Sequence, residues 1–415
     1  MMQKKYFPIT QGLACQAKWA MSSLFLPEGI TRSCHRASTS ELTVGNFDNF
    51  HNLNNKLVDR QKMLDGVWPA DGCDYCQRNE EAGGFSDRML QNQMPNLSPV
   101  ELDVDNKLIF VSPTIIEVFF DNTCNLSCLY CIPELSSKIA DENKNFGEFD
   151  DGGINLHVFE AKQTKTLSPL FWNWMNDNFH SLKRFHFLGG EPFLQKELDT
   201  LIELIDTHPS PDCELSFISN LMISNIRLQK YIEKFKELIK LKKIKKLEIS
   251  ASIDCWGLEQ EYVRHGLKLD QWKENFLYLL NNRWIALNIN QTISALTIKT
   301  MPDLLLQLVE WKKVRPIGHF FSAVTSPSYM QANIFGANVF NDDFKTILSL
   351  MTGDRIQDNS AINYMSSIAD EIELKQRNSK ELKKLLVFLN EKDRRRNTNW
   401  RMTFPWLEEH LNNVV

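Results

Sequence analysis

Three cysteines in one short segment, Cys124, Cys128 and Cys131, have a spacing that could support chemistry. They form a CxxxCxxC pattern directly after the apolar run IIEVFF. A loop that brings three thiolates to one point suits a metal centre, but a closed structural zinc site takes four protein ligands. A four-iron, four-sulfur ([4Fe-4S]) cluster held by three thiolates keeps one iron open. The pattern therefore favours an iron–sulfur cluster with a position at which a further cofactor can bind.

Four cysteines nearer the N-terminus form a second group. Cys73 and Cys76 stand in a CxxC pattern within GVWPADGCDYCQRNEEAGG, which is rich in Gly, Pro and Asp and is therefore predicted to be a structured loop. A CxxC pair alone serves zinc, redox and cluster sites alike. Cys15 and Cys34 lie in the same loop-rich unit and raise the group to four thiols. An iron–sulfur cluster and a structural zinc site both remain open for this group.

Polar groups at the ends of later apolar runs could complete a site around the three cysteines. Gly189 and Gly190 precede Glu191 and a proline, and glycines let backbone approach a ligand closely because they have no side chain. Ser252 ends the run KKLEISAS, and Arg264 follows it in the next loop. These groups fall where a barrel of parallel strands exposes ligand-binding residues.

The elements that would position these groups alternate between strand-like and helix-like patterns from about residue 108 to residue 325. Six strand patterns are predicted, over 115–120, 183–188, 213–222, 245–254, 285–298 and 315–325. Amphipathic helix patterns precede the later five, over 169–180, 196–208, 229–243, 269–282 and 303–313. Such βαβ repetition predicts an α/β fold with a parallel sheet, most consistent with a partial (β/α)6 TIM-like barrel.

The remaining segments flank this predicted barrel. Residues 1–95 are predicted to form a small N-terminal cysteine-bearing domain that gains much of its stability from a bound metal or cluster. Residues 326–415 are predicted to form a helical extension, and the charge run KDRRR within it is expected to be a solvated helix face.

Composition narrows the class of protein. The chain has 415 residues, 43% of them hydrophobic, and a formal net charge of -5. That charge gives no basis for nucleic-acid binding, and no run approaches the roughly 20 apolar residues of a membrane helix. We expect reduced thiols and a cytoplasmic location. Cys213 and Cys255, which stand apart from both cysteine groups, are expected to be packed in the core.

The combination of CxxxCxxC and GGEP at strand ends resembles the radical S-adenosylmethionine (radical SAM) superfamily over roughly residues 108–325. The resemblance implies that Cys124, Cys128 and Cys131 hold a [4Fe-4S] cluster whose fourth iron binds SAM. It implies that Tyr130 lies against the adenine and that the Gly189–Glu191 segment receives the methionyl amino group. Ser252 and Arg264 match the pattern that contacts the SAM carboxylate in the peptide-modifying branch. Cys255 stands where that branch has a glycine.

The N-terminal cysteines resemble the SPASM/twitch auxiliary-cluster module. Cys15, Gly29 and Cys34 have the spacing of its opening motif, and Cys73 and Cys76 would supply the remaining ligands of an auxiliary [4Fe-4S] cluster near the first. In most relatives this module follows the barrel, whereas here it precedes it. The sequence around both cysteine groups is similar to that of twitch-type radical SAM proteins of tailed phages. This similarity implies the host cytoplasm as the location.

The resemblance implies reductive cleavage of SAM to methionine and a 5′-deoxyadenosyl radical, which abstracts hydrogen from a substrate. A peptide or protein substrate is expected, with an electron donor such as flavodoxin or ferredoxin. Modification of a small molecule or nucleotide is the alternative reaction. A non-catalytic metal-binding scaffold is the alternative of a different class.

Overall fold

The structure is a computed structural model. It describes residues 13–70, 72–84, 86–93, 111–150, 155–351 and 356–411. The domain boundaries predicted at residues 95 and 108 lie outside these ranges.

The core of the fold is a nine-stranded sheet with the order β11-β10-β9-β8-β7-β4-β1-β2-β3. Six neighbouring strands of this sheet are parallel and follow chain order. They are β4 (Ile115–Phe119), β7 (Arg184–Leu188), β8 (Glu214–Ser219), β9 (Lys246–Ser252), β10 (Ala286–Ile293) and β11 (Gly318–Ala323). These are the six predicted strands, so the mixed α/β class with a mostly parallel sheet is confirmed. The carboxyl ends of the six strands meet at one edge of the sheet.

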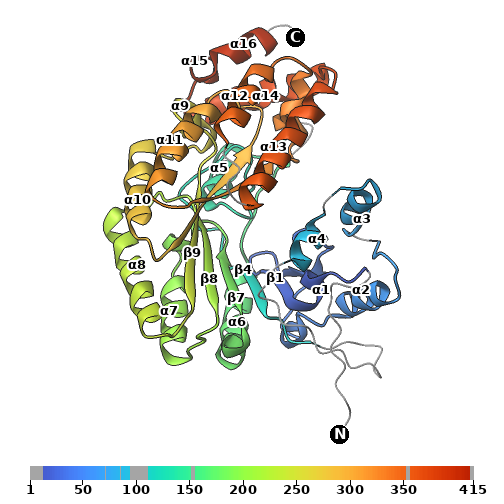
Figure 1. The fold of residues 1–415 in the computed structure, drawn as a ribbon, viewed down its shortest axis with the longest axis vertical. Helices are drawn as coiled ribbons and strands as arrows, with labels where there is room; N and C mark the ends of the chain where they lie inside the picture. The colour runs from blue at the N-terminus through green and yellow to red at the C-terminus, as the bar shows by residue number, and fades with distance from the viewer. Residues whose placement is uncertain are drawn as a thin grey trace.

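Five helices connect these strands and cover one face of the sheet (Figure 1). They are α6 (Thr164–Asn178), α7 (Glu197–Thr207), α8 (Asn225–Lys240), α10 (Leu269–Asn281) and α11 (Met301–Val314). The alternation within β7 explains the layering, because Phe185 and Phe187 are buried in the core while the residues on either side are half-buried. In α8, the buried residues Leu228, Ile232 and Phe235 recur at helical spacing and form the matching apolar stripe.

The N-terminal segment extends the same sheet. Strand β1 (Met21–Phe25) pairs in parallel with β4, in the register Met21 to Ile115. Strands β2 (Ile30–Arg32) and β3 (Ser40–Glu41) continue the sheet in antiparallel fashion. The predicted N-terminal unit is therefore joined to the predicted barrel by backbone hydrogen bonds.

Four short helices lie beside β1, on the side away from α7 and α8 (Figure 1). They are α1 (Gln16–Ala20), α2 (Asn54–Leu64), α3 (Asp74–Glu81) and α4 (Asp87–Asn92). A small apolar cluster separate from the main core lies there and includes Cys15, Trp19, Met63 and Cys73. Two of the N-terminal cysteines are thus part of a local core.

The C-terminal part is helical, as expected. It consists of α12 (Asn341–Leu350), α13 (Ile356–Glu373), α14 (Ser379–Arg396), α15 (Trp400–Thr403) and α16 (Pro405–Leu411). Two further helices, α5 (Ser137–Phe146) and α9 (Leu258–Val263), and the hairpin of β5 (Phe149–Asp150) and β6 (Asn155–Leu156), follow strands of the sheet. None of the described helices is long and apolar enough to cross a membrane.

The charge run of α14 corrects one expectation. Instead of forming a solvated face, Lys392, Arg395 and Arg396 turn toward the protein, and Lys392 and Arg396 form ion pairs with Glu142 of α5. The spacing of these three residues puts them on one side of the helix. Their partner Glu142 lies more than 200 residues away in the chain, so the pairing leaves no local signal in the sequence.

Candidate cluster and cofactor site

The three predicted cluster cysteines lie together in the loop that follows β4. Burial, and then the charge of Cys128, raise the pKa of the Cys124 thiol to about 12. Burial, and then Cys128 and Cys124, raise the pKa of Cys131 even further. Thiols that disfavour each other's ionisation when no cation is present are the donor set that a cationic metal centre stabilises as thiolates. The three side chains therefore fit an iron–sulfur cluster.

The backbone of this cysteine loop is held by the segment that follows α9. The Ser127 N–H donates to the His265 carbonyl at 2.9 Å, and the Leu129 N–H donates to the Val263 carbonyl at 2.9 Å. Gly266 lies in the left-handed region at φ +99°, and a Cβ there would stand 3.1 Å from the Asn125 carbonyl oxygen. The loop thus rests directly on residues 263–266.

The two glycines of GGEP pack against the chain that leads into the cysteine loop. Gly189 and Gly190 have φ values of +90° and +45°. A Cβ on Gly189 would stand 2.7 Å from the Asp121 carbonyl oxygen, and one on Gly190 only 2.1 Å from the Thr123 carbonyl oxygen. The Glu191 N–H donates to the same Thr123 oxygen at 2.8 Å. The glycines are required here because any side chain would push the two loops apart.

The Glu191 carboxylate is fully buried and binds the end of β8. It accepts hydrogen bonds from the Asn220 N–H at 2.7 Å, the Ser219 hydroxyl at 2.8 Å and the Phe193 N–H at 3.2 Å. Burial raises the pKa of Glu191 to about 7, against the opposing effect of these three hydrogen bonds. The side chain therefore fixes the relative position of the β7 and β8 ends, while the backbone of its segment lies beside the cysteine loop.

Asn220, which the sequence left undecided between the pocket and a helix cap, lies beside the cysteine loop. Its side-chain amide donates to Asn125 Oδ1 at 3.0 Å and lies 3.8 Å from the Cys124 sulfur. The available signal in the sequence was its place directly after β8. Because a polar residue at a strand end can also cap the next helix, this position alone did not show whether Asn220 faces the site.

Tyr130 and Arg264 meet at a third residue, Asp254, which the sequence did not assign to the site. The Tyr130 hydroxyl donates to Asp254 Oδ2 at 2.6 Å. Arg264 donates to the same carboxylate through Nε and Nη2, both at 2.8 Å. Burial lowers the pKa of Arg264, but Asp254, Tyr130 and Cys128 outweigh it, so the pKa is raised and the guanidinium stays charged. Ser252, the last residue of β9, is also buried, and its carbonyl accepts from the Trp272 indole at 3.1 Å.

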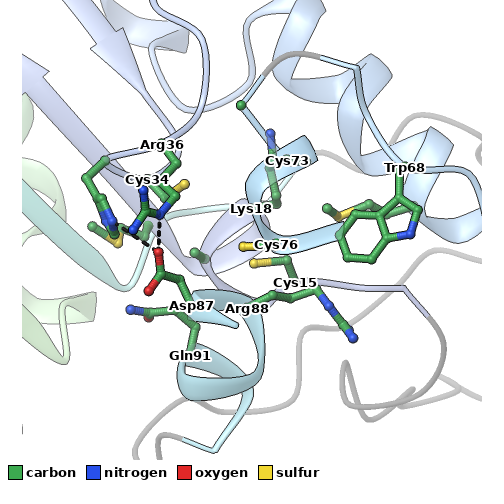
Figure 2. Close-up of a pocket in the computed structure, with 15 residues that line it drawn as sticks. Cys15, Lys18, Cys34, Arg36, Trp68, Cys73, Cys76, Asp87, Arg88 and Gln91 are labelled. Atoms are coloured by element: carbon green, nitrogen blue, oxygen red, sulfur yellow. Dashed lines mark hydrogen bonds and ion pairs between the residues drawn. The ribbon is translucent and has the colours of Figure 1, made fainter. Parts of the chain in front are cut away.

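The N-terminal cysteines also converge, around a hollow of about 480 Å³ that includes its opening to solvent. Figure 2 shows Cys15, Cys34, Cys73 and Cys76 around it, together with Lys18 and other lining residues. Burial, and then the charge of Cys34, raise the pKa of Cys15 to about 12. The pKa of Cys73 is raised to about 11 by burial, with Cys34 and Cys76 adding to the rise. The sequence placed these four residues in one group, and the structure brings them together.

Cations accompany these four thiols. Lys18 is buried and pairs with Asp59. Burial lowers the pKa of Lys18, but Cys73 and Asp59 outweigh burial, so its pKa is raised. Arg88 lines the hollow and forms an ion pair with Glu80. Positive charge beside four thiols suits an anionic tetrathiolate centre.

The two cysteine groups lie at opposite ends of the β1–β4 pair. Cys15 comes before Met21, where β1 begins, whereas Cys124 follows Phe119, where β4 ends. Because Met21 is level with Ile115, the strands alone separate the two groups by about 13 Å along the sheet.

Within the described residues, no three His, Cys, Asp or Glu side chains are arranged to hold a single metal ion.

Other ionisable side chains that could do chemistry are packed or hydrogen-bonded. Cys213 and Cys255 are fully buried, as expected. The ring of His186 accepts from Arg184 at 2.9 Å, and burial, with Arg184, lowers its pKa to about 3. The Tyr262 hydroxyl donates to Asp393 of α14 at 2.7 Å.

No protein-family model and no curated protein matches the chain. Among solved structures, the chain is similar to coproporphyrinogen III oxidase (HemN) from Escherichia coli, described as a radical SAM enzyme. The identity is 12% and the TM-score 0.33, over 59% of this chain and 50% of that one. The chain thus spans about half the length of that protein, and the function proposed for it rests on its own residues.

Proposed function

We propose that this protein is a radical SAM enzyme, in which Cys124, Cys128 and Cys131 hold a [4Fe-4S] cluster with one iron open to SAM. The observation that carries the proposal is the convergence of three thiols with the Gly189–Glu191 loop at the carboxyl end of β4. In barrels of this type, that end of the strands carries the active site. When bound, cluster and SAM supply a 5′-deoxyadenosyl radical that abstracts hydrogen from a substrate.

The chain's own residues would orient SAM. We assign the Tyr130 ring to the adenine and the backbone of Gly189–Glu191 to the methionyl amino group. Ser252 and Arg264 are assigned to the methionyl carboxylate. Arg264 is already bound to Asp254 through two nitrogens, so it meets SAM as a guanidinium whose orientation is fixed in advance, which lowers the entropic cost of binding.

For the N-terminal group we propose a second, twitch-like metal centre held by Cys15, Cys34, Cys73 and Cys76. A [4Fe-4S] cluster is the first candidate and a structural zinc ion the second, because four thiolates satisfy either. Four protein ligands leave no iron open for a substrate. The location at the opposite end of β1 from the other cysteines favours a structural role, tying together α1, α3 and the loop after β2.

The substrate proposed is a peptide or protein, and a small molecule or nucleotide is the alternative. The electron is proposed to come from a flavodoxin- or ferredoxin-like donor in the cytoplasm, which would be a host cytoplasm if the chain is a phage protein. These assignments rest on the resemblance of the cysteine and GGEP motifs to those of the radical SAM superfamily.

Anaerobic reconstitution with iron and sulfide, followed by iron counting and a SAM-cleavage assay with dithionite, tests the proposal. The expected result is about eight irons per chain and production of 5′-deoxyadenosine. About four irons per chain, with zinc bound by the N-terminal cysteines, would show that this group holds a zinc ion and not a second cluster. Absence of 5′-deoxyadenosine from a chain that holds its cluster would leave the non-catalytic scaffold as the conclusion.

Two cysteine variants provide the matched comparison. Cys124→Ala should lose about four irons and all cleavage activity. Cys213→Ala, which changes a buried cysteine outside both groups, should keep both. Equal losses in the two variants would show that the assay reports folding rather than ligation.

A further inference from the structure

The cysteine loop borders a hollow that the proposed SAM site does not use. The hollow has a volume of about 1040 Å³, including its opening to solvent, and is lined by the loop, α5, α14 and residues 265–266. Asn125 and Ser127 line it, and they directly adjoin Cys124 and Cys128 in the chain. Consecutive Cα atoms are about 3.8 Å apart, so the hollow begins one residue away from two of the proposed cluster ligands. Of the described residues that line it, none is among those assigned to SAM.

The charged groups around this hollow have an excess of positive charge. Those that line it are Lys138, Arg395, Arg396, Asp141 and Glu142. Lys392 adds to them through its ion pair with Glu142. Arg394 and Arg395 share one further carboxylate, that of Glu391. Five cations thus stand against three carboxylates, in a chain whose formal net charge is -5. A local surplus of positive charge on an acidic protein attracts a partner that presents negative charge.

An exposed aromatic ring stands among these cations. Phe146, the last residue of α5, lines the hollow and is 45% exposed. The guanidinium carbons of Arg394 and Arg395 lie 5.5 Å and 5.7 Å from the centre of its ring. Aromatic residues and arginines are enriched at protein interfaces and supply much of their binding energy. We call Lys138, Phe146, Arg394 and Arg395 the cationic patch, and its composition is that of a docking surface.

The arginine side of the cationic patch is held in one arrangement. Arg395 is buried and donates to Asn143 Oδ1 at 3.2 Å and to the Gly147 carbonyl at 3.0 Å, both near the end of α5. Arg396 is bound to Glu142 at 2.7 Å, so α14 is tied to α5 at a second point. A partner that docks on prearranged groups loses less entropy than one that must order them.

We propose that the cationic patch is the docking surface for the electron donor, and that this donor is a small acidic flavoprotein of the flavodoxin type. The inference rests on the proposed function, because that reaction consumes an electron that has to come from another protein. Electron transfer slows steeply with distance, so the donor has to bind where the cysteine loop comes near the surface. One electron crosses there: the reduced flavin of the donor is oxidised and the cluster is reduced. The exposed Phe146 ring suits an aromatic flavin edge, and the surrounding cations suit an acidic rim.

Direct binding of a flavodoxin to the reconstituted full chain tests the docking surface without relying on activity. The probe is an acidic bacterial flavodoxin, and calorimetry measures its affinity at about 20 mM and about 300 mM salt. Lys138→Glu combined with Arg394→Glu should weaken binding at low salt by about tenfold or more, and it should reduce the loss of affinity that the wild type shows at high salt. Phe146→Ala should weaken binding and leave the salt dependence unchanged.

Lys236→Glu is the matched control. Lys236 lies on α8, is 51% exposed and pairs with Glu233 three residues earlier. Arg394 is 58% exposed and pairs in the same way with Glu391. Lys236→Glu should bind flavodoxin as the wild type does, whereas Arg394→Glu alone should bind it more weakly. Equal losses of affinity in these two single variants would mean that flavodoxin responds only to the overall charge of the chain, and that would overturn the proposal.

SAM cleavage with two reductants separates docking from chemistry. The double variant should lose most of the 5′-deoxyadenosine formation supported by flavodoxin but keep that supported by dithionite, a small reductant that needs no docking surface. Equal loss with both reductants, or wild-type affinity for flavodoxin in the double variant, would overturn the proposal. A wild-type chain that cleaves SAM with dithionite but does not bind flavodoxin would overturn this inference alone. If dithionite supports no cleavage in a wild-type chain that holds its cluster, the proposed function fails and this inference fails with it.

Discussion

Replacing Asp254 with asparagine should strongly destabilise the protein. Asp254 is fully buried and accepts from two nitrogens of Arg264, from the Tyr130 hydroxyl and from the Thr292 N–H at 2.9 Å. An asparagine keeps one acceptor oxygen and turns an amide group toward the other donors. It also leaves the Arg264 charge buried without a counter-ion.

The magnitude follows from these contacts. Removing one partner of a buried ion pair costs about 3–5 kcal/mol. Tyr130→Phe removes only one hydrogen bond to a charged acceptor, which is worth about 1.5–3 kcal/mol. The free energy of unfolding should therefore fall by more in Asp254→Asn than in Tyr130→Phe.

Urea unfolding of the cluster-free full chain measures both changes. The double variant Asp254→Leu with Arg264→Leu should lose less stability than Asp254→Asn, because no buried charge remains. It should nevertheless fail to cleave SAM after reconstitution. A loss below about 1 kcal/mol in Asp254→Asn would refute the argument, since it would mean that the pair is solvated rather than buried.

Three further outcomes are expected. Gly190→Ala should reduce iron uptake, because its Cβ would stand 2.1 Å from the Thr123 carbonyl oxygen. Gly147→Ala is the control, since Gly147 is also at positive φ but has open space around it among the described residues, and it should not reduce iron uptake. Equal iron uptake in the two variants would contradict the steric argument. The pKa of Glu191 is raised to about 7, so its contribution to stability is fully present below about pH 4.5 and is lost as the pH rises through 7, a change of about 3 kcal/mol. Glu191→Gln should remove this part of the pH dependence, as unfolding midpoints at pH 5 and pH 8 would show, and an unchanged difference would count against it. Cys15→Ser should make the N-terminal segment sensitive to limited proteolysis while SAM cleavage persists. Loss of SAM cleavage with unchanged resistance to proteolysis would point to an electron-transfer role for the N-terminal centre.

The alternation of sequence patterns predicted the six parallel strands and the helices between them, because both periodicities reflect burial on one face. It also placed the cysteine loop and GGEP at the carboxyl ends of neighbouring strands. The parallel pairing of β1 with β4 was not predicted. Met21–Phe25 reads MSSLF and is buried throughout, so its sequence shows neither the alternation nor the continuous apolar run that identifies a strand.

Contacts made far along the chain account for most of what the sequence did not predict at the site. The sequence assigned Arg264 to SAM but could not show that Asp254 binds it, because α9 lies between them and its orientation cannot be read from the sequence. The environment of Glu142 depends on Arg396, 254 residues later in the chain. In both cases the residue types were visible, while their direction was set by the packing of helices on the sheet.

The pairing of β1 with β4 also sets an order for folding. Ser23 of β1 and Glu117 of β4 are hydrogen-bonded although 94 residues separate them. During synthesis, β1 can form its hairpin with β2 early, but its other edge stays unpaired until β4 emerges from the ribosome. Closing so long a loop carries an entropic cost before the contact contributes any stability. Strand β1 is thus an open sheet edge during translation, and it stays open until β4 has been synthesised.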